Sequence, residues 1–360
     1  MRAAFWYYKE RIMRIILVFS ITLGVIFVAG FLVRNIFTQE EKINTSAPAV
    51  PEEKIGGSSP VSPDAAKIFS SVSLPALMEK EFDGRDLKLR RVLAENESYT
   101  RYYITYKSGE LTISGIMNVP KGEGPFPVLF LNHGYIDPAV YTNGRGLKRE
   151  QDYLARAGYV VVHSDYRNHA DSDKDPSNEV NFRLGYTDDV INAIMAVKNS
   201  GLSFVDASRV GLLGHSMGGG VSLNIMVVRP DLVDGVVLFA PVSADFRDNF
   251  TRWLERRPEV AQEIISTYGR PEDNPGFWDN ISASTFFERA VMPVMIHHGT
   301  ADKDVPIAWS DVLYKALIAH NDAVTYHVYP NEPHEFTVAW PEVMKKTKSF
   351  FDANVMKSPQ

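Results

Sequence analysis

A serine flanked by glycines, in the run Gly214-His215-Ser216-Met217-Gly218, stands where a short apolar stretch ends and a helical stretch begins. A G-x-S-x-G sequence alone is a weak signal, but this position favours a sharp turn from a strand into a helix. Glycines suit such a turn because its backbone is strained, and the start of the helix stabilises developing negative charge. We predict that Ser216 is a nucleophile.

A serine hydroxyl reacts slowly near neutral pH, so it needs a base within hydrogen-bonding reach and a carboxylate that orients the base. Asp302 follows the apolar run 293–298, and His334 follows the apolar run 325–330. Both residues therefore come just after a predicted strand, at the edge of an α/β sheet where ligands bind. The chain order Ser, Asp, His suits this kind of sheet, and we predict a triad of Ser216, Asp302 and His334.

A second carboxylate, Asp304, lies two residues further along the same loop. We assign the triad position to Asp302 because it comes first after the strand. Asp304 precedes Val305 and Pro306, which suit the opening turn of the next helix, and we expect its charge to stabilise that helix start.

Backbone N–H groups must also stabilise the oxyanion of the tetrahedral intermediate. One donor normally comes from the residue after the nucleophile, here Met217, and one from the end of an earlier strand. The segment 132–135 closes the strand predicted from the apolar run 127–132, and Gly134, just before Tyr135, lets the backbone come close. We predict the N–H groups of Met217 and Tyr135 as the oxyanion hole, with the Tyr135 hydroxyl as the alternative donor.

Alternating strands and helices must position these residues. Residues 98–120 resemble two strands joined by a Ser-Gly turn, and six later apolar runs suit strands buried on both faces. Helical stretches separate these runs. The predicted fold class is α/β, with a mostly parallel sheet flanked by helices and an antiparallel start. Residues 243–290 interrupt the alternation with several helical pieces, and we predict that they form a lid.

The composition excludes several classes of function. The 38 basic and 44 acidic residues give a formal charge of −6, which disfavours binding to nucleic acid. The chain has no cysteine, which excludes thiolate metal sites and cysteine nucleophiles. The histidines near strand ends lack partners at a metal-ligand spacing, so we predict no metal and no cofactor.

The run 15–33 contains 19 residues without a charge, enough to cross a bilayer as a helix. Basic residues before it predict a cytoplasmic N-terminus and an extracytoplasmic catalytic domain. We expect an anchor in residues 1–38, a flexible linker in 39–64 and one catalytic domain in 65–360. The alternative is a cleaved signal peptide.

The chain resembles the α/β-hydrolase superfamily, and most closely the catalytic domain of prolyl oligopeptidase-type serine peptidases. The resemblance depends on five segments and covers about residues 98–353; the segments are residues 125–135, 164–173, 214–220, 293–306 and 329–336. It implies the α/β-hydrolase fold and a catalytic role for Ser216, Asp302 and His334. Members of that family carry a large β-propeller, for which residues 33–98 are too few.

These observations predict a membrane-anchored serine hydrolase that acts through an acyl-enzyme. The favoured activity is that of a peptidase on short peptides. The alternatives are a carboxylesterase, an acyltransferase, and a non-catalytic interaction protein of the same fold. The expected partners are a short-peptide or small-molecule substrate and the lipid bilayer, and no nucleic acid.

Overall fold

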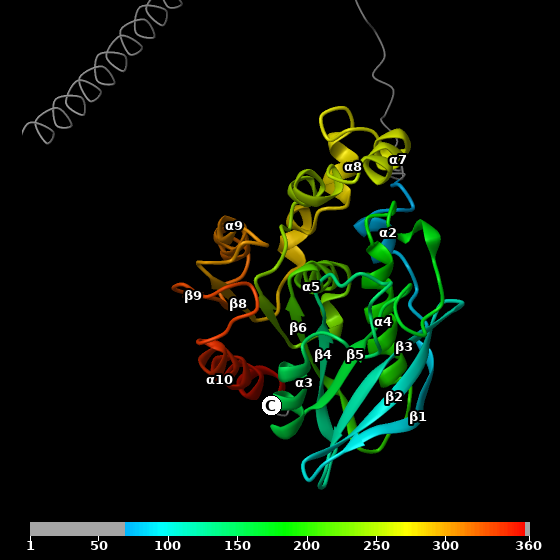
Figure 1. Cartoon of the computed structure of the whole chain (residues 1–360), viewed down its shortest axis with the longest axis vertical. Helices are drawn as coiled ribbons and strands as arrows, with labels where there is room; N and C mark the ends of the chain where they lie inside the picture. Colours follow the sequence, from blue (N-terminus) through cyan, green and yellow to red (C-terminus); the bar gives the residue numbers. More distant parts are fainter. Residues whose placement is uncertain (1–68, 357–360) are drawn as a thin grey trace, which may run out of the picture. The chain divides into compact units, whose positions relative to one another are not determined.

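The computed structural model of the chain describes residues 69–356 (Figure 1). A nine-stranded sheet in the order β1-β2-β3-β5-β4-β6-β7-β8-β9 forms the centre of this part of the chain. Its strands are β1 (Arg85–Glu95), β2 (Tyr99–Ser108), β3 (Leu111–Pro120), β4 (Phe126–Asn132), β5 (Val160–Ser164), β6 (Val205–His215), β7 (Gly235–Phe239), β8 (Val294–Gly299) and β9 (Val324–Tyr329).

The sheet begins antiparallel and continues parallel. Strands β1, β2, β3 and β5 pair antiparallel, whereas β5, β4, β6, β7, β8 and β9 pair parallel. Asn132 at the end of β4 pairs with Gly214, and His215 at the end of β6 pairs with Phe239. The carboxyl ends of the parallel strands therefore lie at one edge of the sheet. The loops that follow these strands, where α/β proteins bind ligands, come together there.

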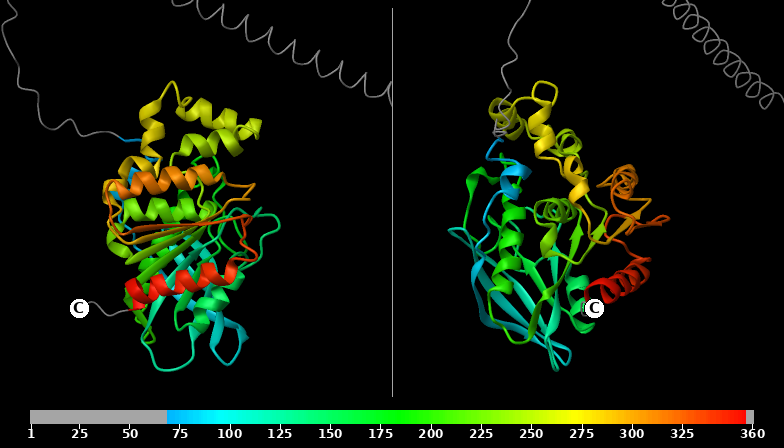
Figure 2. Two further views of the ribbon diagram at one scale, coloured as in Figure 1. Left: turned by 90° about the vertical axis from the view of Figure 1, so that its left-hand side faces the viewer. Right: turned by 180° about the vertical axis from the view of Figure 1, so that it is seen from behind.

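Helices cover both faces of the sheet because the central strands are apolar on both sides (Figure 2). Val128 and Phe130 of β4 join the core cluster formed with α4, α5 and α9, whereas Leu129 and Leu131 join the cluster formed with α3 and α10. The helices are α2 (Leu74–Met78), α3 (Lys148–Arg156), α4 (Leu184–Lys198), α5 (Met217–Val228), α9 (Ile307–Ile318) and α10 (Trp340–Phe351).

The structure confirms the predicted α/β class and the mostly parallel sheet flanked by helices. The six apolar runs are the strands β4 to β9, with ends that differ by a few residues from the prediction. Strand β1 was not predicted. It lies at the sheet edge, and only Leu87 and Leu89 alternate with exposed polar residues before the strand becomes fully exposed, so the alternation is too short to predict a strand.

Residues 243–290, here called the helical insertion, follow the carboxyl end of β7 and lead into β8 (Figure 2). They form α6 (Phe246–Asn249), the π-helical turn η3 (Phe250–Leu254), α7 (Pro258–Tyr268), α8 (Pro275–Asn280) and η4 (Ala283–Arg289). The Phe182 ring, from the loop before α4, lies 5.1 to 5.5 Å from the rings of Phe246, Tyr268, Phe277 and Trp278. This aromatic packing joins the insertion to the rest of the domain.

The predicted membrane anchor in residues 15–33 and the predicted linker in residues 39–64 lie outside the described residues. Between residues 69 and 356, the helices are too short or too polar for any of them to traverse a lipid bilayer.

Candidate active site

Ser216 occupies a strained turn between β6 and α5. Its backbone angles, φ 56° and ψ −120°, lie outside the regions that a serine normally adopts. The Ser216 N–H donates to the carbonyl of Phe239 at 2.9 Å, and its carbonyl accepts from the N–H groups of Gly219 at 2.9 Å and Val242 at 3.2 Å. These bonds hold a conformation that costs about 1–3 kcal/mol, and strain of this kind clusters at functional sites.

Glycines let the end of β4 approach this turn. A Cβ at Gly218 would lie 2.0 Å from the carbonyl oxygen of Asn132, closer than any side chain allows. A Cβ at Gly134 would lie 3.1 Å from the Ser216 Cβ. The predicted oxyanion loop, which continues from β4, therefore lies directly beside the predicted nucleophile.

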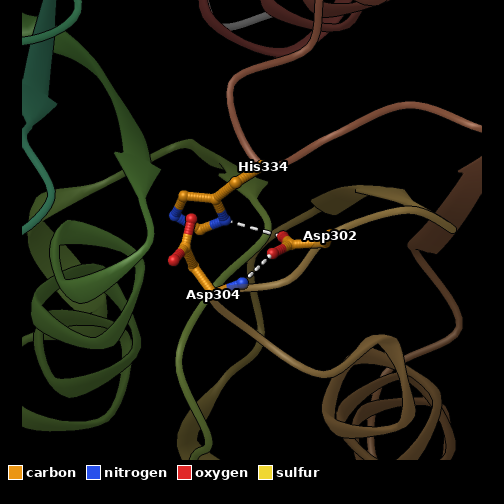
Figure 3. Close-up of side chains that lie close together, drawn as sticks. All are labelled: Asp302, Asp304 and His334. Atoms are coloured by element: carbon orange, nitrogen blue, oxygen red, sulfur yellow. Dashed lines mark hydrogen bonds and ion pairs between the residues drawn. The ribbon is translucent and has the colours of Figure 1, made fainter.

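Asp302 and His334 come from the loops after β8 and β9 and meet in a short hydrogen bond (Figure 3). The Nδ1–H of His334 donates to Oδ2 of Asp302 at 2.6 Å. The Asp302 side chain is fully buried, and the His334 side chain is 11% exposed. With its proton on Nδ1, the neutral imidazole keeps Nε2 as a proton acceptor, the tautomer that a general base requires.

Further donors hold the Asp302 carboxylate. Its Oδ1 accepts the backbone N–H groups of Asp304 and Val305, both at 2.9 Å, and Nε2 of His298 lies 3.2 Å from its Oδ2. Burial alone would raise the pKa of Asp302, but the hydrogen bonds from His298, His334 and Val305 hold it well below its usual value. Asp302 therefore stays ionised and can orient the imidazole.

His215, at the second position of the G-x-S-x-G run, packs against His334. Its Nε2–H donates to the backbone carbonyl of His334 at 3.1 Å, and the two ring centroids lie 4.4 Å apart. Burial lowers the pKa of His215, and the neighbouring His334 lowers it further, so His215 is neutral. The sequence did not predict this contact, because it joins segments 119 residues apart.

Ser216, His334, Tyr135 and Met217 line one cavity of about 570 Å³ together with residues of the helical insertion. Asp302 lies behind His334, so the structure brings all five predicted site residues to one place. Within residues 69–356, no hydrogen bond joins the Ser216 hydroxyl to His334. Catalytic hydrogen bonds often tighten only when substrate binds.

His133 orients the peptide unit that carries one predicted oxyanion donor. Its Nδ1–H donates to the carbonyl of Gly134 at 2.7 Å. That carbonyl and the N–H of Tyr135 belong to the same planar peptide unit, so fixing one fixes the direction of the other. From the sequence we predict no metal binding by the histidines near strand ends and no positioning role for His133. Its position at the strand end, before Gly134, was the one signal of a positioning role.

The Tyr135 side chain is 54% exposed, and its ring lies under the guanidinium of Arg183 at 4.7 Å. Arg183 forms two hydrogen bonds to Glu179, at 2.7 and 3.0 Å, and its Nη1 lies 3.4 Å from the Met217 sulfur. Arg183 therefore contacts the side chains of both predicted oxyanion residues. No sequence pattern indicated this arginine, because its role depends on the path of the loop before α4.

The Asp304 carboxylate lies beside the imidazole ring, on the side away from Asp302 (Figure 3). The N-cap of α9 is Pro306, and no side-chain hydrogen bond caps that helix, so the expected contribution of the Asp304 charge to the helix start stays a prediction. Asp302, Asp304 and His334 could each bring one ligand atom within 4.8 Å of the others. However, both Asp302 oxygens already accept hydrogen bonds and His334 Nδ1 carries a proton, which is the arrangement of a general base oriented by a carboxylate.

Comparison with known proteins places the chain in one family. The model of the prolyl oligopeptidase family matches residues 145–358. Dipeptidyl aminopeptidase BIII of Pseudoxanthomonas mexicana is 26% identical over 251 residues, which are 67% of this chain and 34% of that protein. Esterase EstD of Thermotoga maritima is 27% identical over 144 residues, which are 38% of this chain and 33% of that protein.

Solved structures show the same fold. The acylaminoacyl peptidase of Pyrococcus horikoshii superposes with a TM-score of 0.60 at 19% identity, over 74% of this chain and 43% of that one. The chain spans about a third of the length of the dipeptidyl aminopeptidase that it resembles. The match over residues 145–358 includes Ser216, Asp302 and His334, and the chain belongs to the prolyl oligopeptidase family.

Proposed function

We propose that the protein is a serine hydrolase that acts through an acyl-enzyme, with Ser216, His334 and Asp302 as its catalytic triad. The observation that carries the proposal is the position of Ser216 on a strained turn, in one cavity with an imidazole held by a buried carboxylate. Membership of a serine peptidase family supports it.

In this mechanism, Nε2 of His334 takes the hydroxyl proton while Ser216 attacks the carbonyl carbon of the substrate. The N–H groups of Tyr135 and Met217 stabilise the oxyanion that forms. The protonated imidazole then gives its proton to the leaving group, and an acyl-enzyme remains. Water, activated by the same imidazole, releases the acid. Asp302 stays ionised throughout and stabilises the imidazolium.

We propose short peptides as the substrate class. The peptidase relatives support this, and a cavity of about 570 Å³ suits a ligand of a few residues. A carboxylesterase is the second candidate, because the EstD match covers 144 residues of this chain and the triad serves both reactions. An acyltransferase would pass the acyl group to an acceptor other than water, and a non-catalytic protein would release no product.

A panel of peptidyl amides and acyl esters tests these alternatives, with Ser216→Ala as the matched control. A peptidase cleaves the amides, whereas a carboxylesterase cleaves only the esters. Adding alcohol or amine acceptors diverts the acyl group if the protein is a transferase. Cleavage that is as fast in Ser216→Ala as in the wild type contradicts the proposed mechanism.

The membrane anchor in residues 15–33 is also a proposal. Its support is a run of 19 residues without a charge, preceded by basic residues. We expect the full chain to sediment with membranes and to resist extraction by high salt, whereas a protein starting at Asp64 stays in the supernatant and keeps its activity. A mature N-terminus beyond residue 33 would show a cleaved signal peptide instead.

A further inference from the structure

Arg252, in the π-helical turn η3 of the helical insertion, contacts the loop that carries the proposed catalytic acid. Its Nε–H donates to the backbone carbonyl of Asp304 at 2.8 Å, and an Nη2–H donates to the carbonyl of Lys303 at 3.0 Å. Single-turn π-helical segments occur frequently at functional sites. The insertion and the acid loop, residues 302–306, are therefore joined by one side chain.

Each of these two carbonyls belongs to a peptide unit whose N–H donates to Asp302. The unit between Lys303 and Asp304 gives the N–H of Asp304, and the next unit gives the N–H of Val305. Both N–H groups bind Oδ1 of Asp302 at 2.9 Å. Since a trans peptide is planar, a cation on the carbonyl fixes and polarises the N–H at the other end.

Two tryptophans hold the guanidinium in place. Its carbon lies 5.6 Å from the centre of the Trp253 ring and 5.8 Å from that of Trp309, and the two rings meet edge to face at 5.5 Å. Trp253 belongs to the insertion and lines the cavity, whereas Trp309 lies in the first turn of α9, just after the acid loop. The contacts of Arg252 therefore link the wall of the cavity to the acid loop.

We propose that Arg252 is a positioning residue, through which the helical insertion holds Asp302 in the orientation that His334 requires. The inference rests on the proposed function. The insertion then does more than cover the cavity, because it completes the set of hydrogen bonds around the catalytic acid. Arg252 acts through two peptide units and touches neither substrate nor the reacting atoms.

The rate at which a fluorophosphonate modifies Ser216 measures this role without a known substrate. We expect Arg252→Gln to lower the maximal inactivation rate by about tenfold, less than the loss of a triad member, because charge-assisted hydrogen bonds are lost while the triad remains. The inhibitor concentration for half-maximal rate stays within about twofold, since Arg252 does not contact the ligand. Arg252→Lys is expected to keep part of the rate. The lysine ammonium keeps the positive charge but cannot donate to both carbonyls in the planar geometry of the guanidinium.

Arg247 offers a matched control within the same insertion. It pairs with Asp279 at 2.6 Å and with Asp245 at 3.3 Å, and its hydrogen bonds do not reach the acid loop. We expect Arg247→Gln to react with the fluorophosphonate at the wild-type rate. Equal impairment of Arg247→Gln and Arg252→Gln would overturn the inference, because the insertion would then act only through its general stability.

A double-mutant cycle with Asp302→Asn tests the route of the effect. If Arg252 acts through the Asp302 carboxylate, Arg252→Gln changes the rate by less than about twofold in the Asp302→Asn background. The same tenfold loss in both backgrounds, or no loss in the wild-type background, would overturn the inference. If Arg252→Gln does not fold, Arg252→Lys compared with Arg247→Lys decides, and equal rates overturn the inference. A wild-type protein that is not modified at Ser216 would instead contradict the proposed function.

Discussion

The Nδ1–H of His133 donates to the carbonyl of Gly134, the next residue, at 2.7 Å. The His133 ring is fully buried and stacks on the Tyr166 ring, with the centroids 4.3 Å apart. Burial lowers the pKa of His133 well below its usual value, so the ring is neutral and donates from one nitrogen. This bond sets the direction of the Tyr135 N–H in the proposed oxyanion hole.

We expect His133→Phe to lower kcat by about tenfold to a hundredfold, with little change in KM. The substitution keeps a stacked ring but removes the donor, so the Tyr135 N–H is misdirected rather than lost. Losing an oxyanion donor outright costs about a hundredfold to a thousandfold. Steady-state kinetics and the thermal midpoint of unfolding check this result, and a wild-type kcat in a folded variant would exclude the positioning role.

Asp302 and Asp304 differ in their expected phenotypes although they lie two residues apart. Asp302→Asn is expected to lower kcat by on the order of a thousandfold or more, because the amide cannot fix the imidazole tautomer. Asp304→Asn keeps the bond between His334 and Asp302, and its exposed side chain changes the free energy of unfolding by less than about 0.5 kcal/mol. If the two kinetic phenotypes are reversed, Asp304 is the catalytic acid.

The pKa of Asp302 predicts how stability depends on pH. Its folded pKa lies below the ordinary value of 3.8, so the ionised carboxylate stabilises the folded state above that pH. Below pH 3.8 the unfolded chain protonates Asp302 more readily than the folded protein does. The stabilisation by the carboxylate therefore falls progressively as the pH drops towards the folded pKa. Urea unfolding of the wild type and Asp302→Asn checks it. The difference in unfolding free energy is expected to shrink as the pH falls below about 4. A difference that keeps growing below about pH 4 would contradict the assigned hydrogen bonds.

Gly218 and Gly276 form a matched pair for the close approach at the nucleophile turn. A Cβ at Gly218 would meet the Asn132 carbonyl oxygen at 2.0 Å, whereas a Cβ at Gly276, in α8, would meet no atom within 4 Å. Gly218→Ala is therefore expected to destabilise the protein by about 1–3 kcal/mol or more and to reduce activity. Gly276→Ala is expected to be neutral or stabilising by up to about 1 kcal/mol. Calorimetric unfolding of both variants checks the contrast, and equal stabilities would contradict the packing at Gly218.

The sequence predicts the sheet well where burial is extreme. Strand β4 is apolar on both faces and packs into both core clusters, so its pattern has one structural interpretation. Strand β1 escapes prediction because it lies at an exposed edge, where most of its side chains, apolar ones included, are exposed. Its position depends on pairing and packing with distant parts of the chain.

Some residues of the candidate site could be predicted from the sequence, and others could not. Ser216, Asp302 and His334 stand at strand ends, and the order of strands alone predicts that they meet. The contacts of His133 and Arg252 could not be predicted, because they depend on the direction of a peptide unit and on the path of the helical insertion. The direction of the Asp304 side chain, which turns towards the imidazole, could not be predicted for a similar reason.

The most direct test of the proposed triad is the site at which a fluorophosphonate modifies the full-length protein. Ser216 is expected to react far faster than any surface hydroxyl, because a base and an oxyanion hole activate it. Peptide mapping by mass spectrometry is therefore expected to find one modified residue, Ser216, and no modification in Ser216→Ala or after denaturation. Modification that persists in Ser216→Ala, or an unmodified Ser216 in the folded wild type, would contradict the assignment of this serine as the nucleophile.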